Sequence, residues 1–103
     1  MKRGIFEDDE ILKYLAKNYP GEGFSQHLER RLEDFNDLPG DEKVKINQKS
    51  LDRAKLFASL HLKPSGIFLS RNGNIRLLFE NEQESFGVQI LDEKLQVVQT
   101  FKK

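Results

Sequence analysis

The last third of the chain, residues 64–101, carries the pattern that most restricts the fold. Apolar residues alternate with polar ones in four short runs, at residues 67–69, 75–79, 86–91 and 95–101. Successive side chains of a strand point to opposite faces of a sheet, so a period of two predicts strands. The connections between the runs are short, and one of them contains Asn72-Gly73, a common turn pair in hairpins. The segment therefore predicts a four-stranded antiparallel meander.

The apolar positions also predict how the first two strands pair. A two-residue turn at Asn72-Gly73 would place Leu69 opposite Arg76, so the apolar sets would be out of phase. A three-residue loop that ends at Gly73 places Leu69 opposite Ile75 instead. A slip of one residue turns every side chain to the other face, so we predict the longer loop, with Gly73 in the left-handed region. In the last hairpin, a tight turn at Asp92-Glu93 is expected.

The two faces of this predicted sheet differ in character. One face is apolar throughout, and its expected members are Ile67, Leu69, Ile75, Leu77, Phe79, Phe86, Val88, Ile90, Leu95, Val97 and Phe101. The other face mixes polar residues with Phe68, Leu78, Leu91 and Val98. In a short chain, helices usually cover only one side of such a sheet. These four residues therefore predict a surface for a protein partner or a second copy, and coverage by the N-terminal helix is the alternative.

Helical spacing of apolar residues predicts three helices before the sheet. Asp8 or Asp9 is the expected cap of the first, Ser25 of the second, and Asn47 or Ser50 of the third. The inward-facing residues are expected to be Ile11, Leu12, Leu15, Tyr19, Phe24, Leu28, Leu32, Phe35, Leu51, Ala54, Phe57 and Ala58. A short extended segment at 43–47 precedes the third helix. The predicted class is α+β, with three N-terminal helices packed on a C-terminal four-stranded antiparallel meander. We expect one domain over 1–103, mainly helical over 1–62 and a sheet over 64–103.

Charge and cysteine content exclude several classes of function. The 103 residues include 17 basic and 17 acidic side chains, so no net charge attracts nucleic acid or an anionic membrane. The chain has no cysteine, which excludes disulfides, thiolate catalysis and cysteine-bound zinc. No apolar run approaches the roughly 18–20 residues of a membrane span, and the basic start turns acidic where a signal peptide is apolar. These features predict a cytoplasmic protein that does not bind a membrane.

One segment, residues 41–63, is more basic than the rest, with six basic and three acidic side chains. Within it, Lys45, Lys49, Arg53 and Lys55 are candidates for contact with a phosphate or an acidic partner. A small nucleic-acid-binding regulator is therefore the alternative function. The sheet lacks the set of stacking aromatic residues that RNA-binding sheets use, and a solvated helix face explains the same charges.

Few residues suggest chemistry. His27 and His61 lie on different predicted helices without neighbouring ligands, so neither a metal site nor a cofactor is expected. Glu80, Glu82 and Glu84 share one hairpin loop, where two carboxylates could share a proton or bind a cation, although a solvated loop is favoured. No arrangement of a nucleophile with a base is found. We therefore predict a non-enzymatic protein that acts by protein–protein interaction or self-association.

The stretch from Ser50 to Val98 resembles a pattern in small bacterial α+β proteins of unknown function. In that pattern, a helix leads through a proline to a strand, a turn with Gly, and a second strand. The matching residues are Ser50, Ala54, Phe57, Pro64, Ile67, Asn72, Gly73 and residues 75–79, with Phe79 where the pattern has tryptophan. The resemblance implies an α+β fold and assigns no activity or site.

Overall fold

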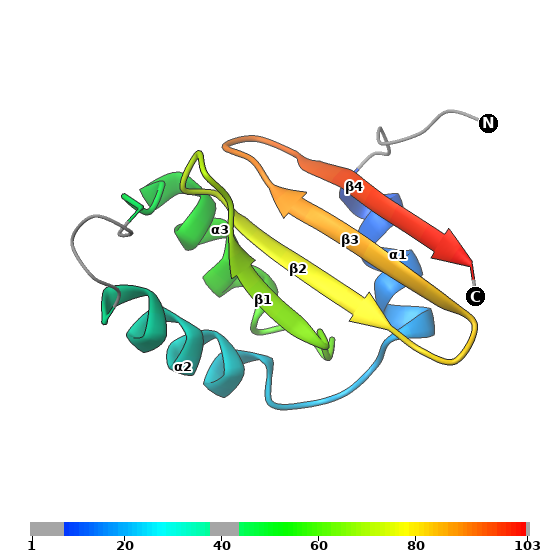
Figure 1. Cartoon of the computed structure of the whole chain (residues 1–103). Helices are drawn as coiled ribbons and strands as arrows, with labels where there is room; N and C mark the ends of the chain where they lie inside the picture. Colours follow the sequence, from blue (N-terminus) through cyan, green and yellow to red (C-terminus); the bar gives the residue numbers. More distant parts are fainter. Residues whose placement is uncertain (1–7, 38–43, 103) are drawn as a thin grey trace.

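Three helices precede four strands in the computed structural model, which describes residues 8–37 and 44–102 (Figure 1). The elements are α1 (Asp8–Asn18), α2 (Phe24–Asn36), α3 (Gln48–Phe57), β1 (Gly66–Leu69), β2 (Ile75–Glu80), β3 (Glu84–Ile90) and β4 (Leu95–Lys102). The strands form one antiparallel sheet in the order β1-β2-β3-β4. The predicted α+β class and the meander are confirmed. Within the described ranges, no helix is long and apolar enough to cross a membrane.

The first two helices begin differently from the prediction. Asp8 and Asp9 lie inside the first turn of α1, where their negative charge opposes the positive end of the helix dipole. α2 begins at Phe24, directly after Gly23, whose φ of 92° lies in the left-handed region. No side chain caps this helix, so the prediction of Ser25 as its cap was wrong. Gly23 occupies the position before the helix in a left-handed conformation, which glycine adopts without the steric cost that a side chain would add.

The third helix begins as predicted. The side chain of Asn47 accepts a hydrogen bond from the backbone N–H of Lys49, at 3.2 Å, and thereby caps α3. The helix ends at Phe57. Residues 44–47 of the predicted extended segment form no strand, and Lys43 lies outside the described residues. The backbone N–H of Asn47 donates instead to the carbonyl of Gly73, at 2.8 Å, which ties the helix start to the β1–β2 turn.

Ser50, the other predicted cap, has a different position. Its side chain is completely buried, and its hydroxyl lies between two strands. The Oγ atom donates to the carbonyl of Ile90 at 2.7 Å and accepts from the backbone N–H of Ile75 at 2.8 Å. Ser50 therefore bridges the last residue of β3 and the first residue of β2, one step beyond their last register pair.

The first hairpin has the predicted register. Leu69 pairs with Ile75, and the backbone N–H of Ser70 donates to the carbonyl of Asn74, at 2.9 Å. Gly73 has a φ of 85°, the left-handed conformation that the three-residue loop requires. A Cβ atom at Gly73 would lie 2.1 Å from the backbone oxygen of Lys45, so the turn packs directly against the segment before α3. Only glycine fits here.

A β-bulge changes the facing of the last strand. Gly87 pairs with Gln99, whereas the next residue of β3 pairs with Val97, so β4 carries one extra residue. Beyond the bulge, Thr100 lies opposite Phe86, and Phe101 lies opposite Ser85 with 61% of its surface exposed. The expectation that Phe101 completes the core face was therefore wrong, because a strict period of two fails across a bulge.

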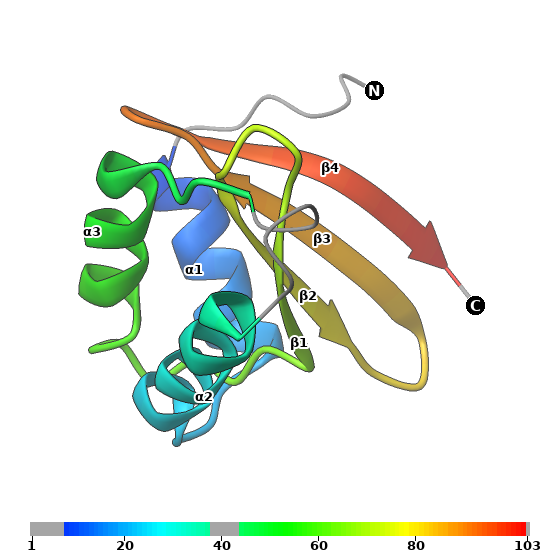
Figure 2. The ribbon, with the colours of Figure 1, turned by 60° about the vertical axis from the view of Figure 1, so that its left-hand side comes forward.

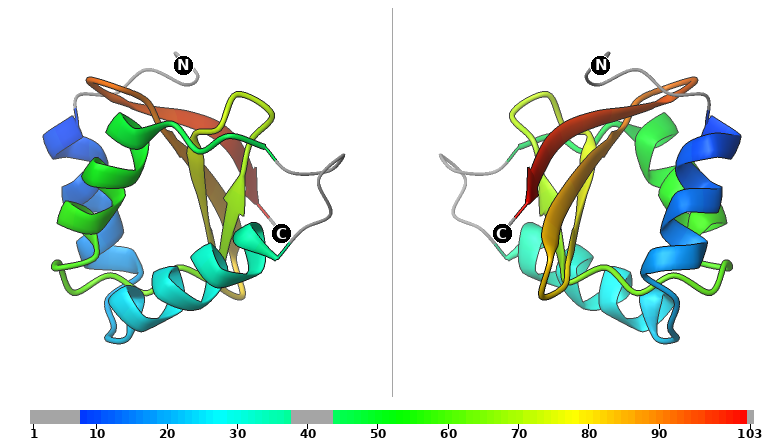
Figure 3. Two further views of the ribbon diagram at one scale, coloured as in Figure 1. Left: turned by 90° about the vertical axis from the view of Figure 1, so that its left-hand side faces the viewer. Right: turned by 90° about the vertical axis from the view of Figure 1, so that its right-hand side faces the viewer.

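The helices lie on one side of the sheet. Figures 2 and 3 show α1 and α3 against this side and α2 beside β1. The buried core comprises Ile11, Leu15, Tyr19, Phe24, Leu28, Phe35, Ala54, Leu62, Ile67, Ile75, Leu77, Phe79, Phe86, Val88, Ile90, Leu95 and Val97. We call the opposite side of the sheet the outer face. Figure 1 views the molecule from the outer face, with α1 and α3 behind the strands.

Charged side chains bind the backbone at both edges of the sheet. At the β1 edge, Arg31 Nε donates to the carbonyl of Ile67 at 2.8 Å, and its guanidinium lies 4.9 Å from the ring centre of Phe35. At the β4 edge, an Asp8 carboxylate oxygen accepts from the backbone N–H of Leu95 at 2.7 Å. Unpaired edge groups invite pairing with another chain, and these side chains occupy part of each edge.

Candidate functional site

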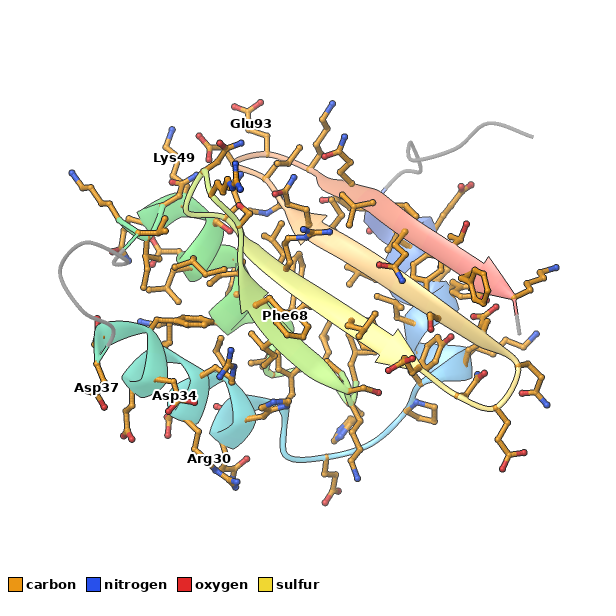
Figure 4. All side chains as sticks on the ribbon, in the orientation of Figure 1. Arg30, Asp34, Asp37, Lys49, Phe68 and Glu93 are labelled. Carbon is orange, nitrogen blue, oxygen red and sulfur yellow. The ribbon has the colours of Figure 1, made fainter. Side chains whose placement is uncertain are left out.

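The outer face is the surface that the sequence predicted as an interaction site, and no described helix covers it (Figures 1 and 2). Phe68 is 46% exposed, whereas Leu78 and Val98 are half-buried. Figure 4 shows Phe68 in front of the strands, on the side away from the helices. These three residues lie together around a shallow hollow of about 230 Å³. The structure therefore brings together three of the four predicted residues.

Two glycines of the outer face lie at this hollow, Gly87 in its lining and Gly66 opposite Leu78 in the strand register. Gly87 pairs with Leu78 on one side and Gln99 on the other, so the centre of the sheet has no side chain at that position. A Cβ atom at Gly87 would lie 3.1 Å from the Cβ of Gln99, a contact tighter than most. At the β1 edge, the Phe68 ring lies over Gly66, where a Cβ atom would be 2.7 Å from the ring.

Leu91, the fourth predicted residue, lies apart from this hollow. It follows the last residue of β3, beyond the paired residues Arg76 and Gln89 and therefore away from Leu78 and Gly87. Its backbone N–H donates to the carbonyl of Lys94 at 2.9 Å, in the predicted tight turn, and its own carbonyl accepts from Arg53 Nη1 at 2.8 Å. Leu91 serves to anchor α3 to the end of the sheet.

The central outer face is poor in charge. By register, its two middle rows are Phe68, Arg76, Gln89 and Gln96, then Gly66, Leu78, Gly87, Val98 and Gln99. Arg76 is the single charged residue of these rows, although 33% of the chain is charged. Gln89 and Gln96 bond to each other, with Nε2 and Oε1 3.1 Å apart. Figure 4 shows charged side chains such as Arg30 and Asp34 at the periphery, on α2. Depletion of charge around aromatic and apolar residues is typical of interface centres.

The basic candidates do not form one group of free cations. Lys45, Lys49 and Lys55 are exposed. Arg53 instead forms an ion pair with Asp8 and lies with its guanidinium 5.4 Å from the ring centre of Phe57. The set therefore comprises three exposed lysines and one arginine that is engaged in an ion pair. Contact with nucleic acid stays a prediction, which a gel shift at low salt would test.

A second hollow lies between α1 and the far end of the sheet, and we call it the α1–β4 groove. It has a volume of about 530 Å³ and is lined by Glu10, Ile11 and Tyr14 of α1, Glu84 and Phe86 of β3, and Thr100, Phe101 and Lys102 of β4. This volume falls in the usual range of small-molecule sites, roughly 300–1,000 Å³.

One carboxylate in this groove accepts two hydrogen bonds from tyrosines. The hydroxyls of Tyr14 and Tyr19 both donate to Oε2 of Glu84. The Tyr14 ring lies against Phe86, with ring centres 5.1 Å apart, and the Tyr19 ring lies against Phe79 at 5.3 Å. The aromatic contacts fix the rings, and the rings in turn fix the carboxylate.

This arrangement keeps both tyrosines protonated. Burial, then the hydrogen bond to Glu84 and its negative charge, raise the pKa of Tyr14 to about 12. The same causes, in the same order, raise the pKa of Tyr19 further. The chain contains two tyrosines, and both are in this cluster. The sequence indicated Glu84 only as a loop residue. The signal for the groove was Tyr14, which lies one helical turn beyond Ile11 at the border of the inward-facing stripe.

The other titratable candidates have ordinary surroundings. Partial burial, then the charges of Arg31 and Arg30, lower the pKa of His27. His61 is exposed. No group of three or more potential metal ligands occurs in the described part of the chain. At the end of β2, Glu80 accepts from the hydroxyl of Ser85, its register partner on β3, at 2.9 Å.

Comparisons with protein-family models, with curated proteins and with solved structures found no match for this chain.

Proposed function

We propose that this is a small non-enzymatic cytoplasmic protein that acts by protein–protein interaction, and that its outer face binds a second copy of the chain. The observation that carries the proposal is the uncovered, charge-poor centre of that face, with Phe68, Leu78 and Val98 around a hollow. Covering exposed apolar residues with a second apolar surface removes them from water, which lowers the free energy and favours association.

The order of side chains on β2 supports a second copy as the occupant. Leu78 lies midway between Arg76 and Glu80 on the outer face. The Cα atom of each of these two charged residues is about 6.7 Å from that of Leu78 along the strand. A twofold axis through Leu78, in the interface plane and across the strands, places Arg76 opposite Glu80 of the partner subunit. The same contact then forms twice, as an isologous interface requires.

The usual angle between packed sheets leaves these contacts within reach. Face-to-face sheets cross at about 30°, which displaces residues 6.7 Å from the axis sideways by about 3 Å. The Arg76 side chain spans that offset. The carboxylate of Glu80 accepts from the hydroxyl of Ser85, and a carboxylate has about four lone-pair sites, so one such group can accept from several donors. Such exposed charge pairs contribute little affinity but fix the relative orientation of the two copies.

The size of the face predicts a weak dimer. Four strands about 4.8 Å apart, with five residues of about 3.3 Å each, give a footprint of roughly 300 Å². Protruding side chains make the accessible surface of this face larger than its flat footprint. Even so, it stays below the roughly 800 Å² that each partner buries in a standard interface. We therefore expect association in the high-micromolar range.

Sedimentation velocity from about 10 μM to 1 mM tests the proposal. The wild-type sedimentation coefficient is expected to rise with concentration, and the rise is expected to disappear in Leu78→Lys, because two ammonium groups then meet at the axis. A lysine stem covers similar apolar surface, so the fold is preserved. Leu56→Lys is the matched control, because Leu56 is 69% exposed on α3, on the helix side.

A charge exchange tests the geometry. Arg76→Glu and Glu80→Arg are each expected to weaken association, because each opposes like charges across the axis. The double variant is expected to restore it. A wild-type chain that remains monomeric at 1 mM would exclude a second copy as the occupant. Equal self-association of wild type and Leu78→Lys would show that the copies meet elsewhere.

A further inference from the structure

We propose that the α1–β4 groove is a binding site for a small organic amine, whose ammonium group binds Glu84 and whose apolar body lies along Tyr14 and Phe86. This inference is independent of the proposed dimer, because the groove opens on the helix side of β3 and β4.

The carboxylate of Glu84 is prepared for a cation before any ligand arrives. Both of its hydrogen bonds from described residues, those from Tyr14 and Tyr19, reach Oε2. Its Oε1 is therefore the oxygen for a ligand. The tyrosine hydroxyls stay protonated to high pH, so they keep this orientation across the physiological range. A group held by two donors loses little freedom on binding, which favours affinity.

The walls beside this carboxylate are aromatic. Tyr14 and Phe86 are tilted by 35° with ring centres 5.1 Å apart, and both residues line the groove. Ring faces attract cations through the quadrupole of the π-system, and more strongly where water is excluded. An ammonium ion on an apolar body satisfies both the carboxylate and the rings. A neutral apolar ligand would leave the carboxylate without a new partner.

The charge balance of the groove favours a cation over an anion. Glu84 and Glu10 supply two negative charges, and Lys102 supplies one positive charge. Lys102 pairs with Glu84 in the strand register, yet no ion pair joins them in the described structure. An apolar anion that bound Lys102 would approach both carboxylates. The volume of about 530 Å³ suits a small molecule rather than a protein segment.

Titration with three matched probes tests the site by NMR of the full chain. Phenethylamine, phenethyl alcohol and 3-phenylpropionate share one aromatic body and differ in charge. We expect phenethylamine alone to shift the ring signals of Tyr14 and Tyr19, with a dissociation constant on the order of 1 mM, as befits so small a ligand.

Variants separate Glu84 from general charge effects. Glu84→Gln is expected to weaken phenethylamine binding at least tenfold. Glu82→Gln, the control from the same hairpin loop, is exposed and is expected to change nothing. Lys102→Gln, on the exposed end of an edge strand, is expected to strengthen amine binding about twofold, and it keeps the test valid if Glu84→Gln does not fold.

Three results would overturn the proposal. The first is the absence of phenethylamine shifts up to about 20 mM, far above the dissociation constant expected for a ligand of this size. The second is tighter binding of 3-phenylpropionate, with loss in Lys102→Gln, which would define an anion site. The third is undiminished amine binding in Glu84→Gln.

Discussion

Replacement of Ser50 by alanine tests how the helix layer holds the sheet together. The Ser50 hydroxyl is fully buried and bonds to Ile90 and Ile75 at 2.7 and 2.8 Å. Alanine fits the same space but leaves a buried carbonyl and a buried N–H without these partners. Each buried group that loses its partner costs about 1–3 kcal/mol. Alanine returns about 0.5 kcal/mol through its higher helix propensity.

Two such groups together cost about 2–6 kcal/mol, so the expected loss is about 1.5–5.5 kcal/mol of the free energy of unfolding. A domain of this size has a stability of about 5–15 kcal/mol, which exceeds this loss over most of both ranges, so the variant should remain folded at 25 °C. The melting temperature is expected to fall by about 6–44 °C, since 1 kcal/mol corresponds to roughly 4–8 °C at this length. Urea unfolding followed by far-UV circular dichroism measures the change, with an unchanged slope against urea.

Ser59→Ala is the matched control. Ser59 is exposed just after α3, and its hydroxyl makes one bond, to the carbonyl of Leu56 at 2.6 Å. Its loss is expected to cost less than about 0.5 kcal/mol. A Ser50→Ala variant as stable as this control would refute the reasoning. It would show that β2 and β3 close on each other, so that the Ile75 N–H binds the Ile90 carbonyl directly. Amide exchange at Ile75 would then stay as slow as in the wild type.

Three further predictions concern single contacts. Gly73→Ala should lower the free energy of unfolding in urea by more than about 2 kcal/mol, because it adds a backbone clash to the strain of a left-handed residue. Gly23→Ala has the same strain and no neighbour within 4 Å, so it should lower this free energy by about 1 kcal/mol. Equal losses would contradict the clash at Gly73. Absorbance at 295 nm should show both tyrosines ionising above pH 10, with a pKa near 12 for Tyr14, and Glu84→Gln should lower both midpoints. Because folding raises these pKa values, the free energy of unfolding should fall as the pH rises from about 10. A midpoint at pH 10 in the folded protein would refute the hydrogen bonds of both tyrosines to Glu84. Asp8→Ala should cost about 1–3 kcal/mol in urea unfolding, because it removes an acceptor from the β4 edge and the ion pair of Arg53, and no loss would show that water replaces it.

Local sequence determined the strands and their first register. The period of two in residues 67–79 fixes which side chains share a face, and Gly73 fixes the loop length. Both are short-range properties, because pleat alternation and left-handed geometry depend only on neighbouring residues. The Asn47 cap is local in the same sense, since its partner is two residues away. These features follow from the sequence without any contact between distant elements.

Two of the features that were predicted wrongly or missed depend on distant residues. The bulge in β4 arises from pairing with β3, so the facing of Phe101 does not follow from β4 alone. Serine is a common residue at helix caps, yet the hydroxyl of Ser50 bonds to two strand residues, Ile75 and Ile90, which lie 25 and 40 residues away in the sequence. Its role requires α3 to lie across the ends of β2 and β3, which only packing decides.

The candidate sites divide in the same way. Alternation placed Phe68, Leu78 and Val98 on the face opposite the core, and only the fold showed that no described helix covers them. The α1–β4 groove was beyond local reasoning, because Tyr14 and Glu84 are 70 residues apart. The sequence by itself determined the strand pattern and the surplus of apolar residues on its second face. The tertiary structure decided which residues bridge, which strand bulges and where a carboxylate meets two tyrosines, because these depend on contacts between segments that no local pattern encodes.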